Sequence, residues 1–111
     1  MDGRLPAHVE VNGLIRAVQA AGGFATVLAK GESDAGTILI VAVENGTNAR
    51  LYERMPKLDG TREFSLTRAQ DSKKPWEFND YLTKRRQQDG DIWIVELDIA
   101  DAERFAAMQH K

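Results

Sequence analysis

Apolar residues recur along the first part of the chain with the spacing of an amphipathic helix. Between Pro6 and the Gly22-Gly23 pair they lie three and four residues apart, which places their side chains on one helix face. These apolar positions are Val11, Leu14, Ile15, Val18 and Ala21. Pro6 suits the first turn of a helix, and Gly22 suits a left-handed cap at its end. This ending should let Phe24 pack back on the last helical turn.

Four segments with the composition of β-strands follow, namely residues 24–30, 37–44, 49–55 and 62–67. The second segment begins TILIVAV and is apolar on both faces, as is typical of a central strand that is covered on both sides. Asn45-Gly46, between the second and third segments, is a strong hairpin signal because both turn positions need positive φ. A second turn at residues 58–61 joins the third segment to the fourth.

Two helical patterns and one strand pattern make up the rest of the chain. Residues 75–88, PWEFNDYLTKRRQQ, place Phe78, Tyr81 and Leu82 on one helical face. Residues 91–99, DIWIVELDI, alternate as a strand that is apolar on both faces. One face carries Trp93, Val95, Leu97 and Ile99, and the other carries Ile92 and Ile94. A short final helix is expected at residues 102–109.

The order of these elements predicts an α+β fold. We expect a single domain over residues 1–111, in which a mostly antiparallel sheet of about five strands packs with two main helices and a short C-terminal helix. The first four strands should form a meander. The returning fifth strand should lie beside the central TILIVAV strand, because both are too apolar for an exposed position.

The composition excludes several classes of protein. Hydrophobic residues at 42% and charged residues at 29% are typical of a globular domain, and a net charge of -2 gives no general attraction to nucleic acid or anionic membranes. The absence of cysteine removes disulfides, thiolate metal sites and cysteine nucleophiles. There is no secretory leader pattern and no apolar run long enough to span a bilayer, so we expect a cytoplasmic protein without a cofactor.

The stretch KGESDAGTILI has two glycines spaced much as in a phosphate-binding P-loop. It lacks the lysine that should follow the second glycine, and a strand rather than a helix is predicted to follow it. Glu32 and Asp34 would also place two negative charges where a polyanion should bind. We therefore expect a hairpin turn, in which Gly31 has positive φ and the Ser33 or Asp34 side chain bonds the backbone.

No catalytic or metal-binding pattern stands out. His8 and His110 lie at opposite ends of the chain and have no second ligand at a recognised spacing, so no metal site is expected. Glu96 and Asp98 are two residues apart on one strand and point the same way, so they are either an acid pair facing a cleft or a solvated strand end. No residue is assigned a catalytic role.

Basic and aromatic residues gather in the middle of the chain. Residues 61–86 hold seven basic and four acidic residues together with several aromatic rings, a mixture that single-stranded nucleic-acid binders use. Near the second turn, arginines and an aspartate could hold an anionic ligand, and a helical arginine could join them. The candidate ligand-binding residues are Arg54, Asp59, Arg62 and Arg86, and the candidate partner-binding residues are Trp76 and Arg85.

Five stretches resemble, in their order and spacing, the small bacterial proteins of the Domain of Unknown Function 1491 family. They are RLPAHV, GGFATVLAKGESDAG, DGTREF, YLTKRRQQD and DIWIVELD. The resemblance covers nearly the whole chain. The family pattern has aspartate, tryptophan and proline at the positions that Glu32, Phe64 and Gly90 hold in this chain. The resemblance implies no activity, ligand or catalytic residue.

Three functions are therefore compatible with the sequence. The first is a non-enzymatic module that binds a protein partner or a second copy of itself. The second is a protein that binds a small anionic ligand or nucleotide through the arginine cluster. The third is single-stranded nucleic-acid binding through residues 61–86.

Overall fold

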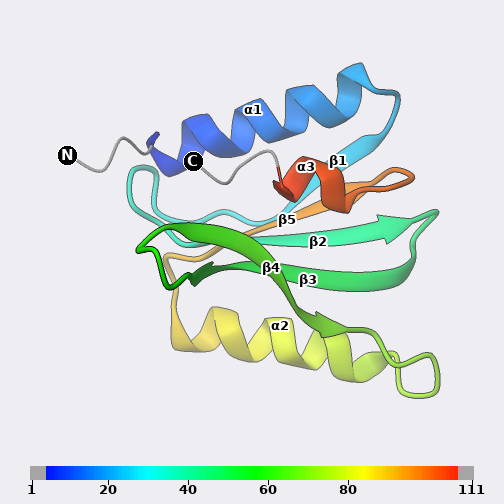
Figure 1. The fold of residues 1–111 in the computed structure, drawn as a ribbon. Helices are drawn as coiled ribbons and strands as arrows, with labels where there is room; N and C mark the ends of the chain where they lie inside the picture. Colours follow the sequence, from blue (N-terminus) through cyan, green and yellow to red (C-terminus); the bar gives the residue numbers. More distant parts are fainter. Residues whose placement is uncertain (1–4, 108–111) are drawn as a thin grey trace.

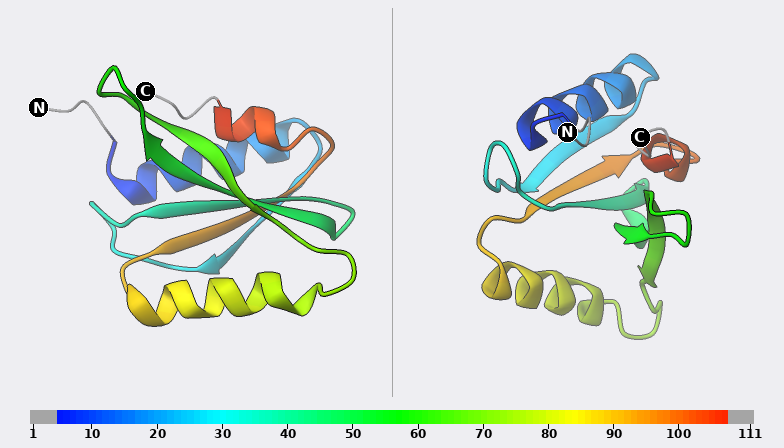
Figure 2. Two further views of the ribbon diagram at one scale, coloured as in Figure 1. Left: turned by 60° about the horizontal axis from the view of Figure 1, so that its bottom comes forward. Right: turned by 60° about the vertical axis from the view of Figure 1, so that its left-hand side comes forward.

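The computed structural model describes residues 5–107, in which helices cover both faces of one five-stranded sheet (Figure 1). α1 and α3 lie on one face and α2 lies on the other, and the views in Figure 2 show the same layers from two further sides. The elements are α1 (Ala7–Ala20), β1 (Phe24–Ala29), β2 (Ile38–Glu44), β3 (Thr47–Pro56), β4 (Arg62–Ala69), α2 (Trp76–Gln88), β5 (Trp93–Asp98) and α3 (Glu103–Ala107). The expected α+β fold is confirmed; the last two residues of the expected final helix lie outside the described residues.

The strands lie in the order β1-β5-β2-β3-β4. β5 pairs parallel to β2 and antiparallel to β1, and the other neighbouring strands are antiparallel. The fifth strand therefore lies beside the central strand, as predicted. The expected meander of four strands is wrong, because β5 separates β1 from β2 and only β2, β3 and β4 form a meander. An interior position suits β5, since both of its faces are then covered by helices.

Two hydrophobic cores lie on the two faces of the sheet. Alternate residues of β5 enter different cores, with Trp93, Val95 and Leu97 toward α1 and α3, and Ile94 toward α2. All of β2 except its last residue is buried, which confirms the prediction of a central strand that is apolar on both faces. The face of α1 that packs on the sheet carries Val11, Leu14 and Val18, as the helical spacing predicted.

The C-terminal end of α1 is a Schellman cap. Gly22 has a φ of 90°, its N–H donates to the Gln19 carbonyl at 3.0 Å, and the Gly23 N–H donates to the Val18 carbonyl at 2.9 Å. The predicted left-handed glycine is confirmed. The packing predicted for Phe24 is wrong, because this side chain is 74% exposed. Phe24 is paired with Asp98 on β5 and so points to the face of the sheet opposite α1.

The segment from Gly31 to Gly36 crosses over the start of β5 instead of forming a hairpin. A Cβ atom on Gly31 would overlap the Asp91 carbonyl oxygen, and one on Gly36 would lie 2.5 Å from the same atom. The Glu32 N–H donates to the Asp91 carbonyl at 3.0 Å, and the Trp93 indole N–H donates to the Glu32 carbonyl at 2.8 Å. Both glycines are therefore needed for close backbone approach. The predicted positive φ at Gly31 is wrong.

The carboxylate of Glu32 organises this crossing segment. It accepts hydrogen bonds from the backbone N–H of Asp34 at 2.7 Å and of Ala35 at 3.0 Å, and these bonds lower its pKa. The Glu32 carboxylate thus binds backbone N–H groups of the kind that bind phosphate in a P-loop. The Ser33 and Asp34 carbonyls accept from the first N–H groups of α1, so the segment also caps that helix.

We expect Gly31→Ala to lower the thermal unfolding temperature markedly, because the new methyl group would overlap the backbone at the start of β5. Gly13→Ala is the matched control. A Cβ atom at position 13, in the middle of α1, meets nothing within 4 Å, so alanine should stabilise the protein by about 0.5–1 kcal/mol. Equal effects of the two substitutions in thermal denaturation would contradict the close approach.

Candidate functional site

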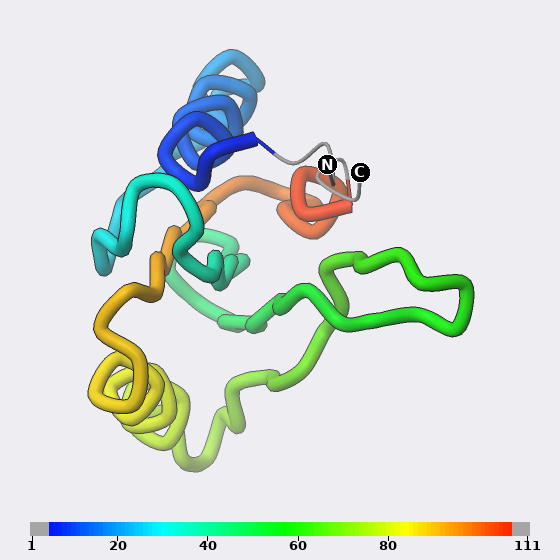
Figure 3. The backbone as a smooth tube through the Cα atoms, turned by 90° about the vertical axis from the view of Figure 1, so that its left-hand side faces the viewer, coloured from blue at the N-terminus to red at the C-terminus, as the bar shows by residue number. Residues whose placement is uncertain are grey.

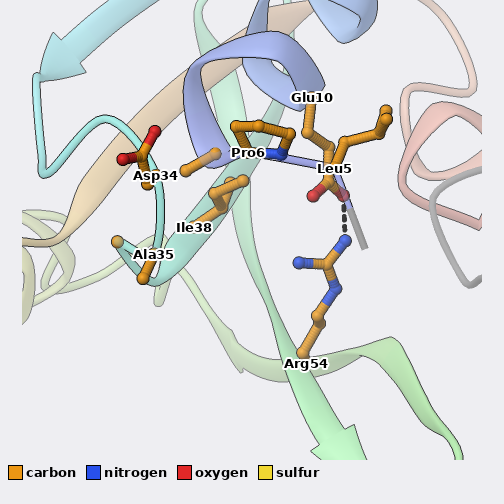
Figure 4. Close-up of a pocket in the computed structure, with 9 residues that line it drawn as sticks. Leu5, Pro6, Glu10, Asp34, Ala35, Ile38 and Arg54 are labelled. Atoms are coloured by element: carbon orange, nitrogen blue, oxygen red, sulfur yellow. Dashed lines mark hydrogen bonds and ion pairs between the residues drawn. The ribbon is translucent and has the colours of Figure 1, made fainter. Parts of the chain in front are cut away.

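A hollow of about 260 Å³ lies between the start of α1 and the crossing segment (Figure 4). At its base Glu10, which is 8% exposed, forms an ion pair with Arg54 of β3. The Arg54 guanidinium also lies over the Phe64 ring, 4.6 Å from its centroid. The pair joins α1 to the β3–β4 hairpin across the core. Arg54 therefore lines the hollow while its guanidinium is paired with Glu10.

The structure brings only some of the candidate ligand-binding residues together. Arg54, Asp59 and Arg62 belong to the β3–β4 hairpin, which reaches out to one side of the molecule in Figure 3. Arg86 lies on α2, on the opposite face of the sheet from the Glu10–Arg54 pair. The Asp59 carboxylate accepts from the Thr61 hydroxyl at 2.7 Å and from the Thr61 N–H at 3.0 Å, and both bonds lower its pKa. Asp59 therefore braces the hairpin turn.

Arg86 instead shares a second hollow with Lys30. This hollow has a volume of about 320 Å³ and lies between the C-terminal end of α2 and the end of β1. Thr83 and Gln87 add polar groups to its wall, while Ala29 and Ile92 are apolar. Its one acidic residue, Asp89, accepts a hydrogen bond from the Asp91 N–H at 3.0 Å. No ion pair joins Lys30 or Arg86 to an acidic side chain within residues 5–107.

The two candidate partner-binding residues differ in exposure. Trp76, the first residue of α2, is 58% exposed. Arg85 is half-buried and donates to the Glu53 carboxylate of β3 and to the Tyr81 hydroxyl, and the bond to Glu53 raises the pKa of Arg85. Arg85 thus holds α2 on the sheet, whereas the Trp76 ring is open to contact.

Glu96 and Asp98 have different surroundings. The Asp98 carboxylate accepts from the Asn45 N–H at 2.7 Å and the Gly46 N–H at 3.0 Å, so it anchors the β2–β3 turn. Glu96 lies between Val41 of β2 and Thr26 of β1 on the sheet surface. Burial raises the pKa of Glu96, and the negative charge of Asp98 raises it further. Asp98 therefore anchors a turn, whereas Glu96 is a partly buried acid.

Two further observations concern metals and membranes. In residues 5–107 no three His, Asp or Glu side chains are grouped to hold a metal ion, and His110 lies outside that range. None of the helices that the structure describes is long and apolar enough to cross a bilayer.

The sheet has two edges of opposite character. β4 forms one edge and carries the charged residues Arg62, Glu63 and Arg68, which discourage pairing with another strand. β1 forms the other edge, and its sequence, FATVLA, carries no charge. Phe24 is 74% exposed on β1, and Val27 and Leu28 are each about 40% exposed. The sequence predicted residues 24–30 as the first strand of a meander but left the strand order open, so it did not identify this edge.

The sequence matches one family over the whole of the described range. The family is described as "Protein of unknown function (DUF1491)", and it matches residues 5–107. The chain belongs to the DUF1491 family. This confirms the family resemblance found in the sequence. No curated protein sequence matches the chain at a significant level.

Solved structures of other DUF1491 proteins share the fold. The crystal structure of a family member from Caulobacter crescentus CB15 has 32% identity and a TM-score of 0.78, and the match covers 92% of this chain and 94% of that one. An NMR structure of a family member from the same organism has 31% identity and a TM-score of 0.75, with 92% of each chain covered. The solution structure of protein Atu0922 from A. tumefaciens has 30% identity and a TM-score of 0.66, with 86% of each chain covered.

We expect Glu96→Gln to raise the thermal unfolding temperature of this DUF1491 chain at pH 7. The folded-state pKa of Glu96 lies above its ordinary value of 4.5, so ionisation costs stability as pH rises through that raised pKa. Well below pH 4.5 the carboxyl is protonated in both the folded and the unfolded state, and the advantage of glutamine should disappear. Glu77→Gln, in the first turn of α2, is the control and should not raise the unfolding temperature. An advantage of Glu96→Gln that did not depend on pH would contradict this role of burial.

Proposed function

We propose that the protein is a non-enzymatic protein-binding module whose partner adds an extended strand to the free edge of β1. The observation that carries the proposal is the contrast between the two sheet edges. An edge strand presents unpaired N–H and C=O groups, and β4 protects its edge with charges while β1 does not. Strand addition of this kind gains affinity from main-chain hydrogen bonds and specificity from alternate side chains.

The surroundings of β1 support the same interpretation. Arg16 is the only charged residue between Val11 and Ala29, although 29% of the whole chain is charged. This stretch includes most of α1 and all of β1, and α1 packs against β1. Depletion of charge is typical of the core of a protein interface. Phe24 and Leu28 provide exposed apolar contacts beside the unpaired backbone.

Peptide titration followed by NMR tests strand addition directly. The probe is a soluble peptide with an uncharged core of alternating threonine and valine and a lysine at each end. We expect it to shift the amide resonances of β1, because its backbone can pair with the uncharged edge.

The amides of β4 are the internal control for this titration, since the charges of β4 oppose pairing at that edge. Shifts confined to β1 would support the proposal. No shifts at saturating peptide, or equal shifts on β1 and β4, would contradict it.

Binding of a small anionic ligand is the second candidate function. The observation that favours it is the convergence of Lys30 and Arg86 on one hollow with a hydroxyl and an amide nearby. A carboxylate or phosphate group suits two cationic side chains in such a site. The hairpin residues Arg54, Asp59 and Arg62 lie elsewhere, so this candidate uses only Arg86 of the four predicted ligand-binding residues.

We expect phosphate or citrate, added at constant ionic strength, to raise the thermal unfolding temperature if this hollow binds anions. Arg86→Gln should abolish the increase. Lys84→Gln is the control, because Lys84 is exposed on the same helix but does not line the hollow. An equal increase in Arg86→Gln, or no increase in the native protein, would exclude anion binding there.

Nucleic-acid binding by residues 61–86 has the least support. Phe64 and Phe78 are buried and Arg85 is engaged by Glu53, while Arg68 lies over the Tyr81 ring at 4.0 Å. Among the aromatic rings of this segment, Trp76 is the one that is largely exposed. A stacking surface for successive bases needs more than one such ring.

A further inference from the structure

We infer that the strand that pairs with β1 is β1 of a second copy of the chain. The inference rests on the proposed function and specifies its partner. The two strands run antiparallel about a two-fold axis that passes beside Thr26, perpendicular to the sheet. The two sheets then join into one, with corresponding faces on the same side.

The sequence of β1 is complementary to itself in this register. Such an axis pairs residues of the same face, so Thr26 meets the second Thr26 and Ala25 meets Val27, all of which precede the register shift of β1. The small Ala25 side chain thus lies opposite the larger Val27 side chain, which is 40% exposed in the single chain. An axis at Val27 would instead place Thr26 opposite Leu28, which lies at the register shift. The Thr26 axis leaves no charge opposite an apolar residue.

The charges around β1 also permit this pairing. β1 carries no charge, so no like charges meet across the new strand pair. The nearest acid is Glu96, which lies beside Thr26 on β5. The two Glu96 residues would be three strand spacings apart, about 14 Å. That separation exceeds the screening length of about 10 Å at 0.1 M salt, so their repulsion is small.

The arrangement stops at a dimer. An antiparallel pair about a two-fold axis uses both copies of the same edge and leaves only the two β4 edges, which are charged.

The register shift between Val27 and Ala29 limits the regular pairing to the first residues of β1. A strand contact this short is small for a stable complex, so the flanks of the two α1 helices, which lie on the same face, must add to it. The stretch from Val11 to Ala20 suits this contact because Arg16 is its only charged residue.

Single cysteines test the register, because the native sequence contains none. Residues that face each other across antiparallel strands have Cα atoms about 4.5–5.5 Å apart, within the range of a disulfide. Under mild oxidation Thr26→Cys should form a disulfide-linked dimer faster than Val27→Cys. Ala69→Cys, exposed on the β4 edge, is the control and should remain monomeric.

Light scattering after size exclusion tests the dimer without a new covalent bond. The native chain should run as a dimer at high micromolar concentration and dissociate on dilution. Thr26→Lys should be monomeric, because two lysines would meet at the axis. This variant should keep its unfolding temperature at low concentration, since the introduced lysine lies beside Glu96 in each monomer. Ala69→Lys, on the other edge, should dimerise as the native chain does.

The outcomes separate this inference from the proposed function. A native chain that stays monomeric at high micromolar concentration, with no cross-linking by Thr26→Cys, would overturn the second copy as the partner. The proposed function would then still stand if the peptide shifts the amides of β1, and would fail with it if the peptide does not. Faster cross-linking of Val27→Cys than of Thr26→Cys would overturn the Thr26 axis. A dimer that Thr26→Lys leaves intact would place the interface elsewhere and overturn pairing through β1.

Discussion

The pairing of β5 with both β1 and β2 is the interaction on which the rest of the structure depends. β5 is apolar on both faces, so it is stable only in the interior of the sheet, where helices cover both sides. Its insertion separates β1 from β2, so the segment that joins these two strands must cross the start of β5. The crossing brings backbone so close to the Asp91 carbonyl that only glycine fits at positions 31 and 36. The crossing segment and the two cores thus both depend on the position of β5 in the sheet.

The two edges of the sheet differ in charge. β4 ends the meander and has charged residues that oppose further pairing. β1 ends the sheet on the other side, and its sequence, FATVLA, carries no charge. The acids nearest this edge act locally, since Asp98 anchors a turn and Glu96 is partly buried. An edge strand of this composition is suited to pairing with another strand.

The sequence predicted the features that depend on local periodicity. The buried face of α1, the left-handed Gly22 and the alternation of Trp93, Val95 and Leu97 each follow from neighbouring residues. Features that depend on distant residues were missed. Asp98 binds the turn at Asn45, 53 residues away, and Gly31 is required by the carbonyl group of Asp91, far along the chain. Arg86 was likewise separated from the hairpin residues Arg54, Asp59 and Arg62, because the face of the sheet that α2 covers is not encoded in any local pattern.

The most direct test of β1 pairing is amide hydrogen exchange measured at low and at high protein concentration. Pairing through β1 predicts that the amides of Phe24–Ala29 that point away from β5 exchange more slowly at high concentration, while those at the outer edge of β4 do not change. Exchange rates in β1 that were independent of protein concentration would contradict a second copy at this edge.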